Sequence, residues 1–409
     1  MKNEGRVAVV GCGPAGLMAA TVLSEAGLSV DLFDTKASAG RKFLVAGRGG
    51  LNLTHSEPTG DFAARYGNNA KTFKKFLAAF SPDALRSWLR GIGVETFVGT
   101  SGRVFPKDAT AQDILKIWLE TLGKRGVTFH YSHRWQGFSQ SGNPLFLTED
   151  GTLREFAARA VLLALGGASW PQTGSDGRWV PILAAKDVHL EPFRPANCGV
   201  EVAWSEHFRT HFSGKPLKNI LLRCCGQQAV GDVVVTAHGL EGGPVYALSA
   251  IIRDLLEKNE SVPLSLDLKR DLPLERIKEK LAHRHGKESL TNFLRKTIRL
   301  TGPAYSLLRE ICSPEDLKHP EGLAERIKNL TVPIVNTRPL AEAISSAGGI
   351  AFSQVNADLM LCKLPGVFVA GEMLDWEAPT GGYLLQGAFT TGHLAAQGLI
   401  KWMGQKTRP

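Results

Sequence analysis

A glycine-rich turn between an apolar strand and a helix constrains the fold of this chain more than any other feature. The N-terminal stretch reads RVAVVGCGPAGLMAATVLSEAGLSVDLFD. It predicts a strand over residues 7–10, a helix over residues 13–26 that Gly27 ends, and a second strand over residues 30–34. This strand–helix–strand order predicts a nucleotide-binding domain of the α/β class.

The turn is a G-x-G-x-x-G motif, and we predict that it holds a pyrophosphate. Its first glycine allows the tight turn, the second lets the backbone approach the phosphates, and the third lets helix and strand pack closely. The helix that follows supplies free amide groups and a partial positive charge. The predicted phosphate-binding residues are Gly11, Gly13, Pro14, Ala15 and Gly16.

Asp34 ends the second predicted strand, at the position where an acidic residue binds the ribose hydroxyls of an adenosine. Thr35 and Lys36 follow directly, and we expect them to contact the same cofactor. An acid here disfavours a 2′-phosphate. The motif is shared by NAD and FAD proteins, so it does not choose between them.

The segments that follow this first strand–helix–strand unit favour FAD over NAD as the cofactor. The turns SGN and EDG separate apolar runs that predict a short β meander, and the buried strand AVLLALGG follows it. Near the end of the chain, an apolar strand over residues 366–372 precedes a helix predicted over residues 383–402. NAD dehydrogenases usually continue with regular βα units, whereas distant segments that meet on one long cofactor are typical of flavoproteins. We therefore predict non-covalent FAD.

The C-terminal strand and turn form a second predicted cradle. The carboxylate of Glu372 is expected to accept a hydrogen bond from the ribityl chain. The turn at Gly381, Gly382 and Tyr383 is expected to face the isoalloxazine ring, where the N-terminus of the last helix would stabilise negative charge. Because no second G-x-G-x-x-G is present, we expect NADH or NADPH to bind only transiently, as an electron donor.

Composition and charge exclude several classes of function. The formal net charge is +9, but between Lys269 and Arg299 ten Lys and Arg residues are mixed with four Asp and Glu residues on helix-like sequence. This pattern favours a solvated helical face over a nucleic-acid site. The six cysteines have no metal-ligand spacing, so we expect no metal and the reduced thiols of a cytoplasmic protein. We also expect no signal peptide and no membrane span.

Six motifs along the chain carry a family resemblance. They read GCGPAG, GRKFLVAGRGGLNLTHSE, GRVFPKDATAQDIL, LALGGASWPQTGSDG, AGGIAFSQVN and AGEMLDWEAPTGGYLLQGAFTTG. Together they resemble the HI0933-like flavoproteins, also called the YhiN/BaiN-like or aminoacetone oxidase family. The family's loop GGGRCN reads GRGGLN here, and its ending GGYN reads GGYL, which indicates a divergent subgroup.

The resemblance implies a Rossmann-like FAD-binding domain, of the type with two dinucleotide-binding domains, that is interrupted by an insert. We expect the FAD-binding domain over residues 1–191 and 341–409 and the insert over residues 192–340. Within the insert, the resemblance implies a β-barrel at about residues 192–262 and 331–340. It implies a helical hairpin at about residues 263–330.

The resemblance also implies cofactor contacts outside the first motif. Arg41 and Lys42 would lie against the FAD phosphates or ribose, and Asn52 would approach the flavin. Arg103 belongs to an RVFP turn that would wall the active site. The other implied cofactor contacts are Trp135, Ala164, Gly166, Gly371, Glu372, Gly382, Tyr383 and Leu384.

The leading functional hypothesis is an FAD-dependent oxidoreductase that acts on a small organic substrate by hydride transfer. The resemblance implies amine oxidation or enone reduction. His55 and Tyr383 are the candidates for moving a proton, and a loop histidine without a chemical role is an equal alternative for His55. Two hypotheses of other classes are a flavin-dependent RNA-modifying enzyme and a non-catalytic FAD-binding or electron-transfer protein.

Overall fold

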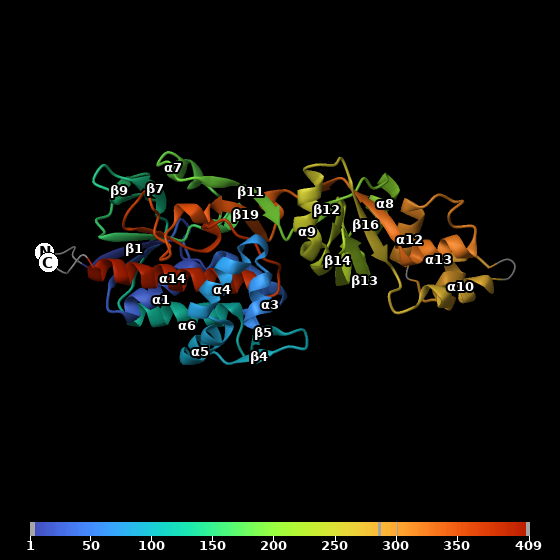
Figure 1. The fold of residues 1–409 in the computed structure, drawn as a ribbon, viewed down its shortest axis with the longest axis horizontal. Helices are drawn as coiled ribbons and strands as arrows, with labels where there is room; N and C mark the ends of the chain where they lie inside the picture. Colours follow the sequence, from blue (N-terminus) through green and yellow to red (C-terminus); the bar gives the residue numbers. More distant parts are fainter. Residues whose placement is uncertain (1–4, 285–287, 301, 406–409) are drawn as a thin grey trace. The chain divides into compact units, whose positions relative to one another are not determined.

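The described part of the chain, residues 5–284, 288–300 and 302–405 of the computed structural model, divides into two units (Figure 1). One unit comprises residues 1–194 and 345–409, and the other comprises residues 195–344. The second unit is therefore inserted into the sequence of the first. Each unit has a hydrophobic core of its own.

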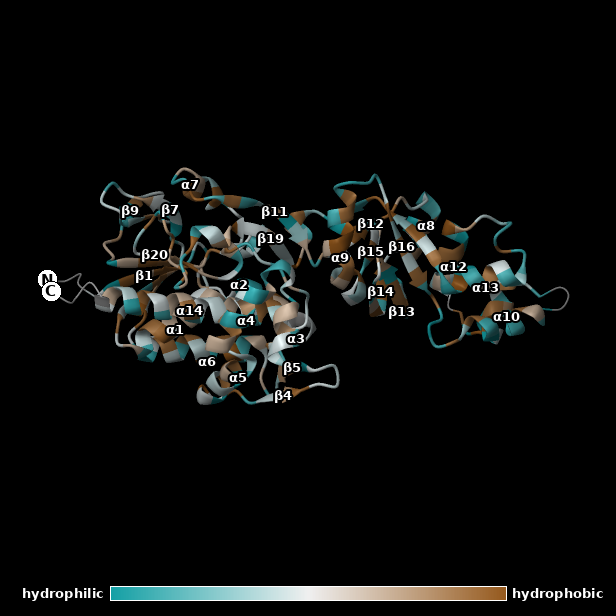
Figure 2. Cartoon of the chain, viewed as in Figure 1, coloured by the Kyte–Doolittle hydropathy of each residue, from teal (hydrophilic) through white to brown (hydrophobic). Residues whose placement is uncertain are grey.

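A five-stranded sheet forms the centre of the first unit, and all its neighbouring strands pair in parallel. Apolar residues fill β1, β10 and β20, which are almost wholly buried, as expected for parallel strands covered on both faces. Figure 2 shows β1 and β20 in hydrophobic colours. Across the sheet, the strands are β20 (Val367–Val369), β10 (Ala160–Leu163), β1 (Arg6–Val10), β2 (Ser29–Phe33) and β6 (Thr128–His130).

Helices cover one face of this sheet and an antiparallel meander covers the other (Figure 1). The sequence DATAQDIL predicts Thr110 as the N-cap of a helix with Asp113 in its first turn, and the structure confirms this, because the two residues form a capping box at the start of α6. The helices are α1 (Pro14–Glu25), α6 (Ala111–Lys124) and α14 (Tyr383–Gln405). The meander consists of β7 (Arg134–Phe138), β8 (Pro144–Leu147) and β9 (Leu153–Glu155).

Four shorter helices and a small sheet stand between β2 and α6. The sequence predicts helices over residues 70–80 and 82–91, which correspond to α4 and α5, after a glycine-rich loop, and it does not predict α2 and α3. The helices are α2 (Arg41–Ala46), α3 (Thr59–Ala64), α4 (Ala70–Ala79) and α5 (Pro82–Gly91). The sheet contains β3 (Thr54–His55), β5 (Arg103–Pro106) and β4 (Thr96–Val98), in that order.

The C-terminal cradle differs in detail from its prediction. The last strand covers only Val367–Val369, and Glu372 lies in a 3-10 turn over Gly371–Met373 rather than at a strand end. Gly371 has a φ of 77°, a conformation that ends the extended strand. Helix α14 begins at Tyr383, as predicted, and continues to Gln405.

The second unit contains a seven-stranded antiparallel sheet and five larger helices. Its two edge strands, β17 and β18, are separated by Val335 alone, so the sheet curls back towards itself. The strands in order are β17 (Leu330–Ile334), β16 (Val262–Asp267), β13 (Pro216–Cys224), β14 (Gln227–Val235), β15 (Gly239–Glu241), β12 (Val200–Glu201) and β18 (Asn336–Thr337). The helices are α9 (Gly243–Leu256), α10 (Leu274–Ala282), α11 (Leu290–Thr297), α12 (Gly302–Ile311) and α13 (Pro320–Lys328).

Two elements of this unit lie where the sequence analysis expected the other type. Helix α9 falls within the stretch assigned to the barrel, and it packs against β14. Strand β16 falls within the stretch assigned to the helical part, and it pairs with β13 and β17. Among the described residues, no helix is both long and apolar enough to cross a membrane.

Candidate functional site

Four of the predicted cofactor-binding segments lie at one edge of the central sheet. In open α/β sheets, ligands bind beyond the carboxyl ends of the strands where the strand order reverses. Here β2 lies on one side of β1 and β10 lies on the other, so the order reverses at β1. The segments are residues 11–16 after β1, 34–36 after β2, 164–166 after β10 and 371–372 after β20.

The glycines of the first loop serve two different purposes. A Cβ on Gly11 would lie 2.2 Å from the carbonyl oxygen of Ala164, and one on Gly16 would lie 1.8 Å from the carbonyl oxygen of Gly11. These two glycines allow close packing of the protein itself. A Cβ on Gly13 would meet nothing within 4 Å, so this glycine leaves open space at the N-terminus of α1. Such space lets a pyrophosphate approach the backbone.

Asp34 ties the end of β2 to the glycine loop. Its carboxylate accepts hydrogen bonds from the backbone N–H groups of Cys12 and Lys36, each at 2.8 Å. Burial raises the pKa of Asp34, although these hydrogen bonds counteract part of the shift. The side chains of Thr35 and Lys36 lie beside Gly174 in the loop after β10, since a Cβ added to that glycine would be 3.4 Å from each of them. The predicted adenosine end is therefore assembled from three segments.

A second polar contact joins three segments at the same edge. The Nζ atom of Lys42 donates a hydrogen bond to Ser169 Oγ at 2.7 Å and lies 2.8 Å from Glu372 Oε2. The side chains of Lys42 and Glu372 are 27% and 16% exposed, so the ion pair is largely shielded from water. One oxygen of the carboxylate predicted to bind the ribityl chain is thus already held by a cation from α2.

Buried polar atoms without a protein partner lie in the predicted cofactor segments or beside them. Among the described residues, these atoms include Asn52 Oδ1, Trp135 Nε1 and Ser175 Oγ. Asn52 and Trp135 were predicted as cofactor contacts. Ser175 was not, although a Cβ on Gly166 would lie 2.8 Å from its hydroxyl. Leaving such an atom unpaired costs about 1–3 kcal/mol. A ligand with hydrogen-bonding groups along its length, as FAD has, fits these three atoms.

The turn before α14 lies against β3. Gly382 has a φ of 107°, and a Cβ there would lie 2.4 Å from the backbone of Thr54. The ring of Tyr383 stacks on the ring of His55 with 5.3 Å between centroids. The hydroxyl of Tyr66 donates a hydrogen bond to the carbonyl oxygen of Tyr383 at 2.7 Å. These contacts fix the turn predicted to face the flavin.

Glu57 and Arg65, which the sequence analysis missed, hold the hydroxyl of Tyr383. Arg65 donates from Nε and Nη2 to the two carboxylate oxygens of Glu57, at 3.1 and 2.9 Å. Both side chains lie near the phenol of Tyr383 and act on its pKa. Burial, together with the hydrogen bond to Glu57, raises the pKa of Tyr383 well above its usual value. The phenol therefore stays protonated at neutral pH.

Both ring nitrogens of His55 are occupied by the backbone. The N–H of Glu57 donates to Nδ1 at 3.1 Å, and Nε2 lies 3.0 Å from the carbonyl oxygen of Ser101. Because a carbonyl oxygen only accepts hydrogen bonds, we assign the ring proton to Nε2, and Nδ1 is then the unprotonated nitrogen that accepts from Glu57. A Cβ on Gly102 would lie 2.6 Å from the ring, which shows how closely the imidazole is packed. This arrangement gives His55 a structural role.

Two predicted residues make weaker contributions to the site. Arg41 is exposed, and its Nε donates to Ser38 Oγ at 3.3 Å. Leu384 is partly buried against the hydrophobic core of the unit. Of the residues that were missed, Ser175 stands in the glycine-rich TGSDG run, whose composition marks a tight loop. No sequence pattern joins Glu57 to Arg65, which are eight residues apart.

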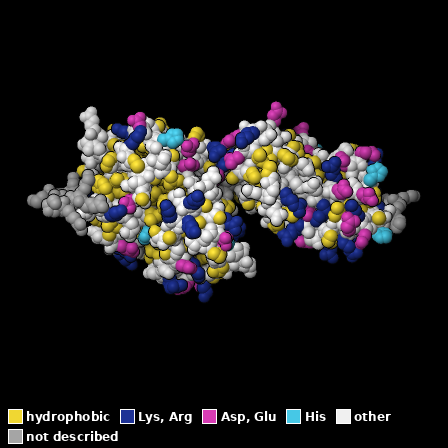
Figure 3. Space-filling model, in the orientation of Figure 1, with side chains coloured by type: hydrophobic (Ala, Val, Ile, Leu, Met, Phe, Trp, Pro, Cys, Tyr) yellow, Lys and Arg dark blue, Asp and Glu magenta, His cyan; other side chains and the backbone are white. Residues whose placement is uncertain are grey.

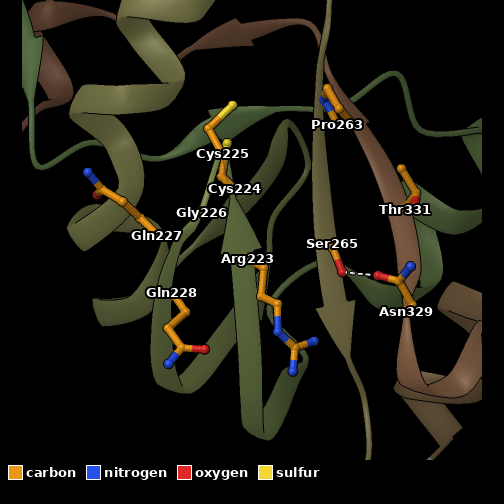
Figure 4. Close-up of a pocket in the computed structure, with 10 residues that line it drawn as sticks. All are labelled: Arg223, Cys224, Cys225, Gly226, Gln227, Gln228, Pro263, Ser265, Asn329 and Thr331. Carbon is orange, nitrogen blue, oxygen red and sulfur yellow. Dashed lines mark hydrogen bonds between the residues drawn. The ribbon is translucent and has the colours of Figure 1, made fainter.

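A separate pocket lies in the second unit, at the turn between β13 and β14 (Figure 4). Its volume is about 340 Å³, and its walls carry thiol, amide and hydroxyl groups from Cys224, Cys225, Ser265 and Asn329. Ser265 and Asn329 hydrogen-bond to each other across it. The pocket contains none of the predicted cofactor residues.

The chain belongs to the HI0933-like family, because the family model described as "HI0933-like protein Rossmann domain" matches residues 5–398. The family predicted from the sequence is therefore confirmed. The predictions of a Rossmann-like FAD-binding fold and of an FAD-dependent oxidoreductase are confirmed with it.

Two curated relatives match nearly the whole chain. A 3-dehydro-bile acid delta(4,6)-reductase of Clostridium scindens is 24% identical, and the match covers 96% of this chain and 98% of the relative. A ribosomal RNA dihydrouridine synthase of Escherichia coli is also 24% identical, with 96% and 97% covered.

A solved structure shares the fold of the chain. The 3-ketosteroid-delta4-(5alpha)-dehydrogenase of Rhodococcus jostii superposes with a TM-score of 0.53 at 17% identity, and the match covers 97% of each chain. At this level of identity the likeness concerns the fold alone.

Proposed function

We propose that this protein is an FAD-dependent reductase that saturates a carbon–carbon double bond conjugated to a carbonyl in a small organic substrate. One observation carries the proposal: the two kinds of curated relative, different in substrate, are both named for reduction at such a bond. A delta(4,6)-reductase reduces a double bond by its name, and dihydrouridine is uridine with its conjugated C5=C6 bond reduced.

The residues at the sheet edge fit the parts of FAD in order. Residues 11–16 and the N-terminus of α1 would hold the pyrophosphate, and Asp34 would bind the adenosine ribose. Glu372, oriented by Lys42, would bind the ribityl chain. The N-terminus of α14 would stabilise negative charge on the ring system. Bound FAD supplies the hydride, and the protein binds and orients the substrate.

The state of the two candidate proton-transfer residues supports reduction over amine oxidation. Neither His55 nor Tyr383 offers a free basic atom, because the first is held by backbone groups and the second has a raised pKa that keeps its phenol protonated. An amine oxidase must bind its substrate as the neutral amine, without the additional proton that makes it an ammonium ion. Reduction of an enone needs no protein base, since the proton that completes the product can come from water.

The test is an anaerobic half-reaction experiment on the FAD-loaded protein. The flavin is reduced with NADH or NADPH, and each is compared with dithionite as a chemical reductant. Reduced protein is then mixed with 2-cyclohexen-1-one, 4-androstene-3,17-dione or the saturated ketone cyclohexanone. We expect the enones, and not cyclohexanone, to restore the oxidised flavin spectrum. Reduction of the oxidised protein by benzylamine or aminoacetone, without reoxidation by any enone, would overturn the proposal.

A second candidate function is the reduction of a pyrimidine base in RNA. It is favoured by the relative named as a ribosomal RNA dihydrouridine synthase and by three lysines exposed on α4, Lys71, Lys74 and Lys75. In the part of the chain that the structure describes, these lysines have no ion-pair partner. Against it, Figure 3 shows Lys and Arg side chains interspersed with Asp and Glu. Salt-dependent binding of ribosomal RNA fragments, followed by mass spectrometry for dihydrouridine, would distinguish it from the enone reductase.

A further inference from the structure

Arg103 stands beside the turn that is expected to face the flavin. It lies in β5, directly opposite His55 of β3 in the antiparallel register. Its Nε atom would lie 3.4 Å from a Cβ placed on Gly381, so the guanidinium reaches over the Gly381–Gly382 turn. Gly381 has a φ of 114° and no side chain, which leaves that approach open.

Arg103 is also a hydrogen-bond donor without a partner among the described residues around this turn. Its neighbours satisfy one another: Glu57 pairs with Arg65, both hold the phenol of Tyr383, and His55 is bound by backbone groups. The Arg103 side chain is exposed, and no described residue forms a hydrogen bond or an ion pair with its guanidinium. A guanidinium keeps its charge at every physiological pH and presents several donors in one plane.

The same hairpin places apolar aromatic surface next to this cation. Phe105, two residues after Arg103, stacks on Phe97 with 5.6 Å between ring centroids. Phe97 is 48% exposed and, as the partner of Phe105 in the register, shares the face of the hairpin that carries Arg103. A large apolar side chain this exposed beside a free cation suits a ligand that carries one oxygen acceptor on an apolar frame.

We infer that Arg103 binds the carbonyl oxygen of an apolar substrate and stabilises the negative charge that develops on it, an inference that rests on the proposed function. During reduction, a hydride from the reduced cofactor adds to the β-carbon, and the π electrons of the double bond move to the carbonyl oxygen. A proton from water then completes the α-carbon, and the carbonyl re-forms. A reduced pyridine nucleotide restores the cofactor. A donor fixed where charge develops is the usual means of lowering such a barrier.

The test uses a phenolate, which imitates the anionic oxygen on a flat apolar ring and requires no turnover. Oxidised FAD-loaded protein is titrated with 4-chlorophenol at fixed pH, and the long-wavelength charge-transfer absorption is followed. We expect Arg103→Gln to weaken binding tenfold or more, as loss of a charged hydrogen bond implies, and Arg103→Lys to recover part of it. Lys107→Gln removes an equal charge from an exposed residue that follows β5, and we expect it to bind as the unaltered protein does.

The outcomes separate this inference from the proposed function. Equal binding by Arg103→Gln and the unaltered protein, an equal loss in Lys107→Gln, or no phenol binding by the unaltered protein would each overturn the role of Arg103. Phenol binding that depends on Arg103, in a protein whose reduced flavin no enone reoxidises, would support the oxyanion site and overturn the proposed reaction. FAD content and thermal unfolding of each variant show whether it is folded.

Discussion

The ammonium group of Lys42 lies 2.8 Å from a carboxylate oxygen of Glu372, although 330 residues separate them in the sequence. Lys42 comes from the first turn of α2, after β2, and Glu372 comes from the turn after β20. Ser169, in the loop after β10, accepts a hydrogen bond from the same ammonium group. The Lys42 ammonium group therefore joins the segments that follow β2, β10 and β20, at the edge of the sheet where the cofactor is expected.

Replacing Glu372 with Gln should weaken FAD binding. The amide keeps the size of the side chain but removes its charge, and Lys42 then remains as a shielded cation without its counter-ion. We expect about a tenfold rise in the FAD dissociation constant, or about 1.4 kcal/mol, measured by flavin fluorescence on mixing apoprotein with FAD. Lys107→Gln, which removes an exposed cation outside the predicted cofactor segments, is the matched control. Equal affinities in all three proteins would contradict the role of the pair.

Two alanine substitutions in the first loop should fail in different ways. Gly13→Ala adds a methyl group in open space, so the apoprotein should keep its stability to within about 0.5 kcal/mol but lose FAD affinity. Gly16→Ala forces a Cβ to within 1.8 Å of the carbonyl oxygen of Gly11, so it should destabilise the apoprotein itself. Urea unfolding of both apoproteins, together with FAD titration, measures the two effects. Tight FAD binding by Gly13→Ala would show that the pyrophosphate lies elsewhere.

Asp34→Ala should reduce FAD retention through two losses. The carboxylate that would bind the ribose is removed, and the N–H groups of Cys12 and Lys36 lose their acceptor. Hydrogen bonds to charged groups contribute roughly 1.5–3 kcal/mol, so we expect FAD binding to weaken by at least tenfold. Absorbance of the flavin after gel filtration measures its occupancy. Asp108→Ala, at an exposed loop position, should keep the full complement, and unchanged occupancy in both variants would rule out the ribose role.

Features set by neighbouring residues could be predicted from the sequence, whereas features set by distant segments could not. The strands β1 and β2, helix α1 and the N-cap of α6 at Thr110 follow from patterns within a few residues, and the structure has each within one residue of its predicted bounds. The pairing of Lys42 with Glu372 and the occupied state of His55 depend on segments far apart in the chain. Such contacts arise from tertiary packing, and periodicity or spacing carries no trace of them.

Acid should destabilise the fold through Asp31. Its buried carboxylate accepts from Arg6 Nε at 2.7 Å and lies 2.7 Å from His130 Nε2. Burial alone would raise the pKa of Asp31, but the hydrogen bonds and charges of His130 and Arg6 outweigh it and lower the pKa.

Because the folded-state pKa of Asp31 lies below its unfolded value, near 3.9, this stabilisation is present above about pH 4 and is lost as the pH falls through the folded pKa. Asp31→Asn should cost roughly 2 kcal/mol at neutral pH, less than a wholly buried pair because Arg6 is 39% exposed. Chemical denaturation from pH 3 to 7 should show the two proteins converging only at the acid end. A constant difference would exclude titration of Asp31 as the cause.

Removing the second unit should leave a folded protein that still binds FAD. The chain leaves the first unit along β11 (Leu190–Ala196) and returns along β19 (Ser345–Ile350), and these strands pair with each other. Neighbouring strands lie about 5 Å apart, so a short Gly–Ser linker can replace residues 195–344 without strain. The residues expected to bind FAD all belong to the remaining unit, which has a hydrophobic core of its own. We expect cooperative unfolding and measurable FAD binding by the shortened chain. A shortened chain that folds, as judged by circular dichroism, but takes up no FAD would assign part of the cofactor site to the second unit.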